Sequence, residues 1–445
     1  MSGAADHLSQ VYEIGRRLQS SARHGDAAVV YRQVLRGNPG HMQAALGLGE
    51  VLTELGELSE AVAVFRQMLA IRSDFGECWT ALGHVLREMG ELDESVAAYR
   101  RAVELEPFNP SVHNNLGGAY KDRGESGLAI AEYQTAISLR PDFVDATLNL
   151  SLALLLGGDL GNGFALYEAR RELREPLYAL PRWTGEPLGG RRVLLWTRQG
   201  LGDVIQFVRY APMIEARGGR AIVVCKPQLR RLMEGQSGVW QVVADTEPAP
   251  AAELQCPLLS LPLVFGTTMQ TIPSTPYLNA DASISARWRA KLDRERPGLR
   301  VGLNWAGNPI PRRNRKRTFD PATMTALSGI PSVRFYSLQK GDEVPPPPPE
   351  LELIDWTSEI TDMADTAGLI VNLDLVITCD TSVAHLAGAL GARTWVGLPF
   401  APDWRWLLGR DDSPWYPTMR LFRQPRPGDW STVMNSIASE LAKLH

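Results

Sequence analysis

The sequence predicts a two-part fold: an all-α repeat solenoid over residues 1–177, followed by an α/β region over residues 178–445. Two observations carry this prediction. An aromatic residue recurs every 34 positions through the first part, and strand-like apolar runs alternate with helical segments through the second. The composition, 44% hydrophobic and 22% charged residues, is typical of a globular protein, and the length suits about two to four domains.

The repeating unit of the first part has several fixed positions. The aromatic positions are Tyr31, Phe65, Tyr99, Tyr133 and Tyr167, and the turn glycines are Gly56, Gly90, Gly124 and Gly158. A leucine followed by a glycine stands at 48–49, 82–83 and 116–117. A 34-residue helix–turn–helix unit with this pattern resembles the tetratricopeptide repeat. We expect five units, at 8–41, 42–75, 76–109, 110–143 and 144–177, the first of which lacks the turn glycine.

Ligand contacts in such a solenoid are expected on its concave face. Asn115 and Asn149 stand one repeat apart, each just before a leucine of the repeat pattern. Two amides spaced in this way could bind successive peptide groups of an extended protein ligand. The alternative interpretation of this acceptor groove is a polar surface that is simply hydrated.

Two series of strand-like runs make up the second part. The first series is 193–196, 221–225 and 254–259, and the second is 301–305, 334–338, 351–355, 373–379 and 394–398. Each series opens with a strand that ends in a glycine-bearing loop, "QGLGD" with Gly200 and Gly202, or "WAGNP". Parallel sheets bind ligands at the carboxyl ends of their strands. We therefore expect two Rossmann-like halves, at 178–282 and 283–445, facing each other across a cleft, with a helix closing the chain.

The stretch "CDTSVAHLAGALG", residues 379–391, places polar side chains where a strand passes into a helix. Thr381 or Ser382 could simply cap that helix. Because the free N–H groups and the dipole of a helix start also attract anions, the cluster of Asp380, Thr381, Ser382 and His385 favours a phosphate-bearing ligand. The basic loop "RRNRKR", residues 312–317, follows another strand and could contact the same phosphate, or it could be a solvated surface loop.

These segments together resemble the ADP-heptose–lipopolysaccharide heptosyltransferases over roughly residues 178–445. The 379–391 stretch is similar to their Asp-Thr-x-x-x-His-Leu segment, which holds the donor diphosphate. "QGLGDVIQFVRYAP" resembles their N-terminal loop and helix, which places their proposed catalytic base on Asp203. "RNRKRTFDP" resembles their phosphate-binding loop, with its lysine at Lys316 or Arg317, and "SLQKG" stands where they contact the nucleotide. Ser382 replaces a glycine that is usual in that family, which points to a different sugar nucleotide.

The resemblance implies a GT-B fold and an inverting glycosyltransferase that uses no metal and no cofactor beyond its donor substrate, a nucleotide-diphosphate sugar. The nucleotide-sugar contacts that it implies are Asn304, Arg315, Lys316, Arg317, Gln339, Lys340, Asp380, Thr381, Ser382 and His385. A general base must accept the proton of the attacking hydroxyl. Asp203 is the first candidate for that base, and its alternative role is a helix N-terminal contact that only orders the loop. Asp380 is the second candidate.

The fusion of repeats to such a domain also resembles protein O-glycosyltransferases, the O-linked N-acetylglucosamine transferases and the bacterial flagellin glycosyltransferases. The first hypothesis is therefore transfer to a protein hydroxyl, with the repeats recruiting the acceptor. The second is a cell-surface polysaccharide or lipopolysaccharide glycosyltransferase whose repeats dock an assembly partner. The third is a catalytically inactive repeat scaffold.

Charge and cysteine placement exclude other classes. Residues 1–177 hold 16 basic and 24 acidic side chains, and the remainder holds 30 and 26, so a mildly basic second part follows an acidic first part. The net charge of −4 does not favour nucleic acid as a partner. The four cysteines are far apart, without a zinc-binding spacing. The start of the chain has no signal-peptide pattern and no apolar run is long enough to span a bilayer, so we expect a cytoplasmic protein.

Overall fold

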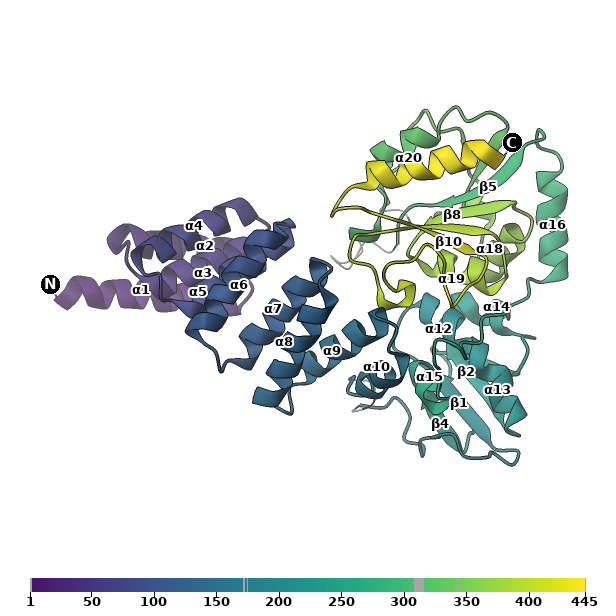
Figure 1. Cartoon of the computed structure of the whole chain (residues 1–445), viewed down its shortest axis with the longest axis horizontal. Helices are drawn as coiled ribbons and strands as arrows, with labels where there is room; N and C mark the ends of the chain where they lie inside the picture. Colours follow the sequence, from purple (N-terminus) through teal and green to yellow (C-terminus); the bar gives the residue numbers. More distant parts are fainter. Residues whose placement is uncertain (1, 171–172, 174, 308–315, 342–343, 445) are drawn as a thin grey trace. The chain divides into compact units, whose positions relative to one another are not determined.

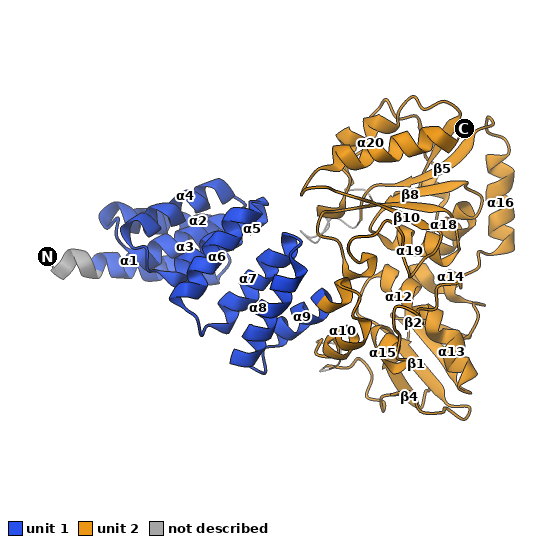
Figure 2. Ribbon diagram, viewed as in Figure 1, with its two compact units in different colours: residues 1–153 blue, residues 154–445 orange. Residues whose placement is uncertain are grey.

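A computed structural model of the chain describes residues 2–170, 173, 175–307, 316–341 and 344–444, with its elements shown in Figure 1. The chain forms two compact units, residues 1–153 and residues 154–445, which are coloured separately in Figure 2. Each unit has its own core. The predicted fold class is confirmed: helical repeats come first and parallel α/β structure follows.

The first unit is built from helices that pack as consecutive neighbours. Their bounds are α1 (Ser2–Ser20), α2 (His24–Gly37), α3 (Met42–Leu55), α4 (Leu58–Ile71), α5 (Gly76–Met89), α6 (Leu92–Leu105), α7 (Pro110–Asp122), α8 (Ser126–Leu139) and α9 (Val144–Leu156), the last of which crosses into the second unit. The two helices of one repeat contact each other, as α5 contacts α6, and the next repeat adds its first helix to that pair.

The 34-residue pattern has a direct packing cause. The repeat aromatics Phe65, Tyr99 and Tyr133 are at most 1% exposed, and each lies over a glycine of its own repeat. A Cβ atom at Gly83 would lie 2.9 Å from the ring of Tyr99, closer than real Cβ contacts. The glycine of the repeat is thus required by the close approach of the aromatic ring.

The turn glycines are required for a different reason. Gly56, Gly90 and Gly124 have φ angles of 81°, 86° and 85°, the left-handed conformation that ends a helix and that side chains disfavour. The first repeat has Ala22 at the equivalent position, and its φ of 57° is left-handed as well. The first repeat therefore keeps the turn geometry without the glycine, at a conformational cost.

The second unit contains two separate parallel sheets. The first has the order β3-β2-β1-β4, and the second has the order β10-β9-β8-β5-β6-β7. The strands of the first sheet are β1 (Arg192–Trp196), β2 (Arg220–Cys225), β3 (Val239–Ala244) and β4 (Leu254–Pro257). Those of the second are β5 (Leu299–Asn304), β6 (Val333–Ser337), β7 (Leu353–Ile354), β8 (Leu375–Cys379), β9 (Thr394–Leu398) and β10 (Met419–Arg423).

Helices follow most of these strands, as a parallel sheet requires. With the first sheet go α12 (Leu201–Phe207), α13 (Ala211–Ala216), α14 (Arg230–Met233) and α15 (Leu261–Val264), and with the second go α16 (Ala282–Leu292), α18 (Met363–Ile370), α19 (Ser382–Ala389) and α20 (Trp430–Leu441). Figure 1 shows α12 and α19 between the two sheets, and these two helices contact each other. The helix predicted at the end of the chain is present as α20.

The strand prediction needs four corrections. β3 and β10 were not predicted, and the run 351–355 forms only the two-residue strand β7. β3 and β10 are edge strands whose outer residues include exposed polar ones, so neither has the continuous apolar run of a central strand. The run 254–259 is a strand only to Pro257, after which the chain turns into a short 3₁₀ helix.

Helix α10 (Leu160–Tyr167), the second helix of the fifth repeat, belongs to the second unit. Its Phe164 packs edge-on against Trp404, with ring centroids 5.5 Å apart. Just beyond the helix, Arg170 donates a hydrogen bond to Ser260 at 2.5 Å. The contacts of the fifth repeat therefore divide between two units, and the domain boundaries expected after residues 177 and 282 stay predictions.

Candidate functional site

The two glycine and helix motifs predicted from sequence meet at one place in the second unit. Gly202 lies in the first turn of α12, after β1, and His385 lies in α19, after β8. A Cβ atom at Gly202 would lie 2.7 Å from Cδ2 of His385, so only glycine permits this approach. Gly200 precedes them as the N-cap residue of α12. The predicted glycine loop thus joins the carboxyl-end regions of the two sheets.

Asp203, the predicted base, lies beside this contact with both carboxylate oxygens engaged. Its Oδ2 accepts a hydrogen bond from the Gly200 backbone N–H at 3.0 Å, and its Oδ1 lies 2.5 Å from Nη2 of Arg405. The side chain is 19% exposed, so it remains within reach of solvent and of a ligand. Asp203 therefore does order the start of α12, but this contact uses only its Oδ2 atom.

Arg405 was not predicted, although it organises the charges of this region. Its Nε donates to Gln206 at 2.5 Å, and its Nη1 donates to Asp403 at 2.9 Å. Burial of the guanidinium acts to lower the pKa of Arg405, but the Asp403 and Asp203 carboxylates outweigh burial and raise it above its ordinary value. Arg405 is therefore a permanent buried cation between two carboxylates.

Asp380, at the end of β8, is a carboxyl group that titrates near neutral pH. Burial raises the pKa of Asp380 to about 6, and the Asp403 carboxylate adds to this shift, while Arg317 and Arg405 oppose it. The closest cation is Arg317, whose Nη1 lies 3.8 Å from Oδ2 of Asp380, beyond hydrogen-bond distance. A carboxyl group of this kind can exchange a proton under physiological conditions.

Thr381 caps α19, as the simpler of its two interpretations requires. Its hydroxyl oxygen accepts from the Val383 N–H at 3.3 Å and donates to Oδ1 of Asn304 at 2.7 Å. Asn304 in turn donates to Oε1 of Gln339 at 2.8 Å. The same Gln339 oxygen accepts from the backbone N–H groups of the two residues that follow Asn304. These three predicted ligand contacts therefore form one hydrogen-bond network that shapes the loop after β5.

His385 is buried and uncharged. Its Nδ1 lies 2.9 Å from the hydroxyl of Tyr416, and its ring stacks on Trp406 with centroids 5.5 Å apart. Burial lowers the pKa of His385 well below its ordinary value, and the guanidinium groups of Arg405, Arg209 and Arg317 act in the same direction. Any hydrogen bond from His385 to an anion is therefore that of a neutral imidazole.

The buried N–H donors beside these residues that have no acceptor among the described residues include Nε2 of Gln206 and Nε of Arg317. Gln206 is 0% exposed, and a buried donor without a partner costs about 1–3 kcal/mol. A ligand that supplies acceptor oxygens, such as a phosphate, would satisfy them.

The remaining residues predicted for the donor site are not part of the hydrogen-bond network described above. Lys316 is exposed, and Ser382 is the partly buried first residue of α19. Nζ of Lys340 donates to two loop carbonyl groups, those of Thr357 and Ile360, both at 2.9 Å. That lysine therefore holds a loop in the described arrangement. Arg315 lies outside the described residues.

The asparagines predicted to contact an extended ligand, Asn115 and Asn149, lie on α7 and α9, and their ligand-binding role stays a prediction. Asn149 donates to Oδ1 of Asn114 on α7 at 2.9 Å, and Asn115 is partly buried. The amide contact between consecutive repeats thus involves a residue, Asn114, that the sequence analysis did not select. The three amides still share the first helices of neighbouring repeats.

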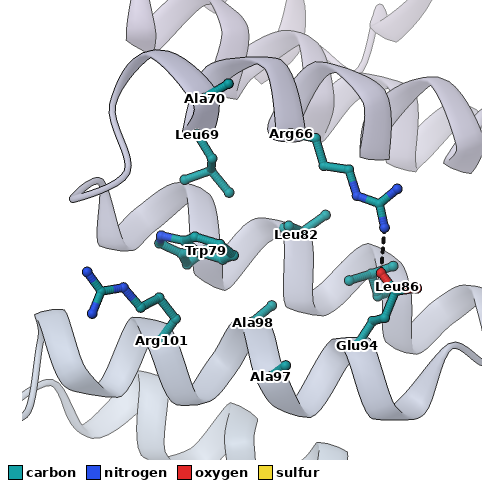
Figure 3. A pocket seen from close by; sticks show the side chains of 10 residues that line it. All are labelled: Arg66, Leu69, Ala70, Trp79, Leu82, Leu86, Glu94, Ala97, Ala98 and Arg101. Carbon is teal, nitrogen blue, oxygen red and sulfur yellow. Dashed lines mark hydrogen bonds and ion pairs between the residues drawn. The ribbon is translucent and has the colours of Figure 1, made fainter.

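A second surface feature of the repeats is a groove of about 650 Å³, shown in Figure 3. Its lining comes from α4, α5 and α6, with Leu82 and Leu86 of α5 between flanking helices. Arg66 and Glu94 form an ion pair at 2.5 Å across it. The indole N–H of Trp79 is engaged by the Ser73 carbonyl group at 2.9 Å. None of the three asparagines lines this groove.

No group of three or more His, Cys, Asp or Glu side chains in the described part of the chain is placed to hold a metal ion. No helix in the described ranges combines the length and the apolar character that crossing a membrane requires.

The signal for Arg405 and its neighbours was present in the sequence. "PDWRW", residues 402–406, follows β9 in the same way that "QGLGD" follows β1 and "DTS" follows β8. All three segments lie at the carboxyl ends of parallel strands. An aspartate, an arginine and two tryptophans at such a position are a candidate site by the same reasoning that selected Asp203 and Asp380.

Comparisons with known proteins identify the repeats. Residues 83–124 match the family described as TPR repeat, and residues 12–74 and 119–172 match the family described as tetratricopeptide repeat. The predicted repeats are thereby confirmed. A curated relative, Protein FlbA of Caulobacter vibrioides, is 30% identical over 295 residues, which are 60% of this chain. The chain spans about half of that relative's length, 49%.

Solved structures also resemble part of this chain. A crystal structure of MamA is 23% identical, with a TM-score of 0.34, over 36% of this chain and 95% of that chain. TTC0263, a thermophilic TPR protein of Thermus thermophilus, is 20% identical, with a TM-score of 0.34, over 38% and 93% of the two chains.

Proposed function

We propose that this chain is a metal-independent, inverting glycosyltransferase of GT-B type that moves a sugar from a nucleotide-diphosphate sugar to a protein hydroxyl group. The observation that supports this most is the meeting of α12 and α19. It brings an accessible carboxylate, Asp203, close to buried, unpartnered N–H donors at the carboxyl ends of two parallel sheets.

The donor diphosphate is proposed to bind at the α19 side. As the bond between the anomeric carbon and the diphosphate oxygen breaks, the electron pair leaves with the diphosphate. The growing negative charge needs fixed donors that are already in place. Arg317, with its unpartnered Nε, and the start of α19 supply a cation and backbone N–H groups for it. The Thr381, Asn304 and Gln339 network is proposed to hold the surrounding loop rather than to contact the phosphate directly.

The acceptor hydroxyl is proposed to lose its proton to Asp203. The hydroxyl oxygen forms the new bond to the anomeric carbon, the diphosphate departs from the opposite face, and the carboxylate of Asp203 receives the proton. The ion pair with Arg405, at 2.5 Å, favours the ionised form of this carboxylate, which a base requires. Asp380 is the alternative base, since its pKa of about 6 also suits proton transfer, but it is only 7% exposed.

The acceptor is proposed to be a protein that the repeats recruit, with flagellin-type O-glycosylation as the model case. Tetratricopeptide repeats bind protein segments on the face formed by their first helices. Asn114, Asn115 and Asn149 lie on these helices in consecutive repeats and can bind the peptide groups of an extended chain. Binding energy far from the reacting atoms would then place the acceptor hydroxyl near the donor.

One observation favours a different function, that of an inactive repeat scaffold. Asp203 is engaged through both oxygens, and Gln206, Asp380 and His385 are less than 9% exposed. A site closed in this way could have lost turnover while keeping its packing. A ligand-binding experiment separates the two functions.

The test is a thermal-shift screen of the full chain with nucleoside diphosphates, nucleoside monophosphates and nucleotide sugars, followed by intact-mass analysis of candidate acceptor proteins. The proposal predicts that at least one nucleoside diphosphate raises the melting temperature more than its monophosphate does. It also predicts that the matching nucleotide sugar adds one sugar mass to an acceptor. Absence of any shift across the common nucleoside diphosphates would contradict the donor site and favour the scaffold.

A further inference from the structure

We propose that Arg405 is the positioning residue of the site: it holds Asp203 ionised and correctly oriented, and helix α10 of the last repeat supports it. This inference rests on the proposed function, because it assigns a role relative to the base of that reaction. Its geometric part, the attachment of α12 to the segment after β9, stands without the reaction and can be measured separately.

The guanidinium of Arg405 is bonded on three sides. Nη2 binds Asp203 at 2.5 Å, Nε binds Gln206 at 2.5 Å, and Nη1 binds Asp403 at 2.9 Å. The first two partners belong to α12 of the first sheet region, while Asp403 is the N-cap residue of the 3₁₀ turn that carries Arg405 itself. Arg405 thus crosses from one sheet region to the other and is fixed at both ends.

The aromatic surroundings of Arg405 leave it little freedom. The guanidinium carbon lies 4.5 Å from the ring centroid of Trp404 and 5.8 Å from that of Phe207. Trp404 is in turn packed edge-on by Phe164 of α10, at 5.5 Å and an interplanar angle of 89°. The last repeat helix therefore forms part of the support behind the proposed base.

The charge and shape of arginine suit this place better than those of lysine. Three acceptors lie around one planar group, and only a guanidinium presents donors in a fixed plane toward all of them. A lysine ammonium could keep the positive charge opposite Asp203, but it would lose the planar set of N–H donors that reaches all three acceptors. Comparing these two residues therefore separates the effect of charge from the effect of orientation.

Removing the cation changes the protonation of Asp203 in a defined direction. In the described part of the chain, the ionisable groups around Asp203 and Arg405 include Asp403 after β9, Asp380 after β8, His385 of α19 and Tyr167 of α10. Nη2 of Arg405 is an ionic partner of Asp203 at 2.5 Å, and His385 is neutral. Without Arg405, Asp203 loses this bonded cation while the Asp403 carboxylate remains close to the site, so Asp203 binds a proton more readily.

The fold does not depend on Arg405 alone. Arg209, which follows α12, makes a second crossing: its Nη1 donates to the backbone carbonyl group of Trp415 at 2.9 Å, and its Nη2 donates to the Tyr277 hydroxyl at 3.0 Å. Variants of Arg405 keep this second attachment. We therefore expect them to fold, with the first turn of α12 loosened locally.

The experiment compares Arg405→Met, Arg405→Lys and a control, Arg410→Met, in the full chain. Arg410 lies in the same segment but pairs only locally with Asp412, at 2.6 Å. Amide hydrogen exchange is measured over residues 200–207 and, as an internal reference, over α20. Arg405→Met should exchange at least about tenfold faster over 200–207 with no change in α20, Arg405→Lys should lie between it and the parent, and Arg410→Met should match the parent.

The kinetic arm uses whichever nucleotide sugar the parent turns over. Arg405→Met should lower kcat at least about tenfold with little change in KM for the donor, and the acid limb of its pH profile should move up by about one to three pH units. Arg405→Lys should restore the parent's acid limb but only part of kcat. If Arg405→Met shows faster amide hydrogen exchange but an unchanged acid limb of its pH profile, Arg405 has only a structural role and its proposed role at the base is overturned.

A parent chain that turns over no nucleotide sugar would contradict the proposed function itself. A parent that turns over one, while Arg405→Met matches it in rate, pH profile and exchange, would overturn the positioning role alone.

Discussion

Removing residues 1–177 should unfold much of what remains, whereas removing residues 1–143 should not. The shorter fragment, 178–445, lacks α10, which belongs to the compact unit formed by residues 154–445. The longer fragment, 144–445, keeps α9 and α10 whole. The difference between the two fragments therefore measures what the last repeat helix contributes to the α/β region.

The size of this effect follows from three buried side chains. Leu160 and Phe164 of α10 are each 2% exposed, and losing a buried side chain of this size costs about 2–5 kcal/mol. Arg170, 4% exposed, also disappears, which leaves the hydroxyl of Ser260 without its guanidinium partner. The total loss is about 5–10 kcal/mol, comparable to the whole stability of a typical domain, which is about 5–15 kcal/mol.

The assay is urea unfolding of both fragments, followed by tryptophan fluorescence and by near-ultraviolet circular dichroism. Fragment 144–445 should unfold cooperatively with a midpoint close to that of the α/β transition in the full chain. Fragment 178–445 should be unfolded or only partly folded without urea. Equal urea midpoints for the two fragments would refute the reasoning, because α10 would then contribute nothing to the stability of the α/β region. Tests of acceptor recruitment should accordingly use fragment 144–445.

Three further predictions follow from single residues. Positions 22 and 90 both have left-handed φ, so Ala22→Gly should stabilise the first repeat by about 1 kcal/mol and Gly90→Ala should destabilise the third by about as much. Urea unfolding measures both changes, and two changes of the same sign would contradict this prediction. Arg317→Met should weaken nucleoside diphosphate binding about tenfold or more by calorimetry, while Arg410→Met should leave it unchanged, and unchanged affinity in Arg317→Met would remove this residue from the donor site. The pKa of Asp380 is raised to about 6 in the folded state, so its contribution to stability is present below its unfolded pKa and is lost as the pH rises through 6. The free energy of unfolding of Asp380→Asn should therefore rise by about 2–3 kcal/mol relative to that of the parent as the pH increases from about 4 to about 7.5. If the difference between variant and parent does not change with pH, the pKa of this carboxyl group is not raised.

The repeats could be predicted because their determinants are local. Gly83 is a glycine because the ring of Tyr99, 16 positions later, lies against it, and the same pair recurs as Gly117 with Tyr133. A pattern repeated at a fixed spacing can be recognised without knowing any long-range contact. The central strands were also predictable, since both of their faces are covered and their sequences are continuous apolar runs.

The site was only half predictable, because its contacts are long-range. The segments after β1 and β8 could each be selected by their position at a strand end. That Arg405 would bind Asp203, 202 positions away, depends on how two sheets meet, and no local pattern encodes that meeting. The same limit applies to the hydrogen bond between Asn149 and Asn114, which no local pattern encodes. Residue type and approximate place were accessible, but the partner of each side chain was not.

The most direct test of the central claim is the release of nucleoside diphosphate from a panel of nucleotide sugars by the full chain and by Asp203→Asn. The substitution keeps the size of the side chain and one hydrogen-bond acceptor, but it removes the capacity to accept the proton. We predict that the parent releases nucleoside diphosphate from at least one sugar nucleotide, and that Asp203→Asn binds that donor equally well but releases the diphosphate at least about 100-fold more slowly. Release at the parent's rate by Asp203→Asn, or no release from any donor by the parent, would contradict the account.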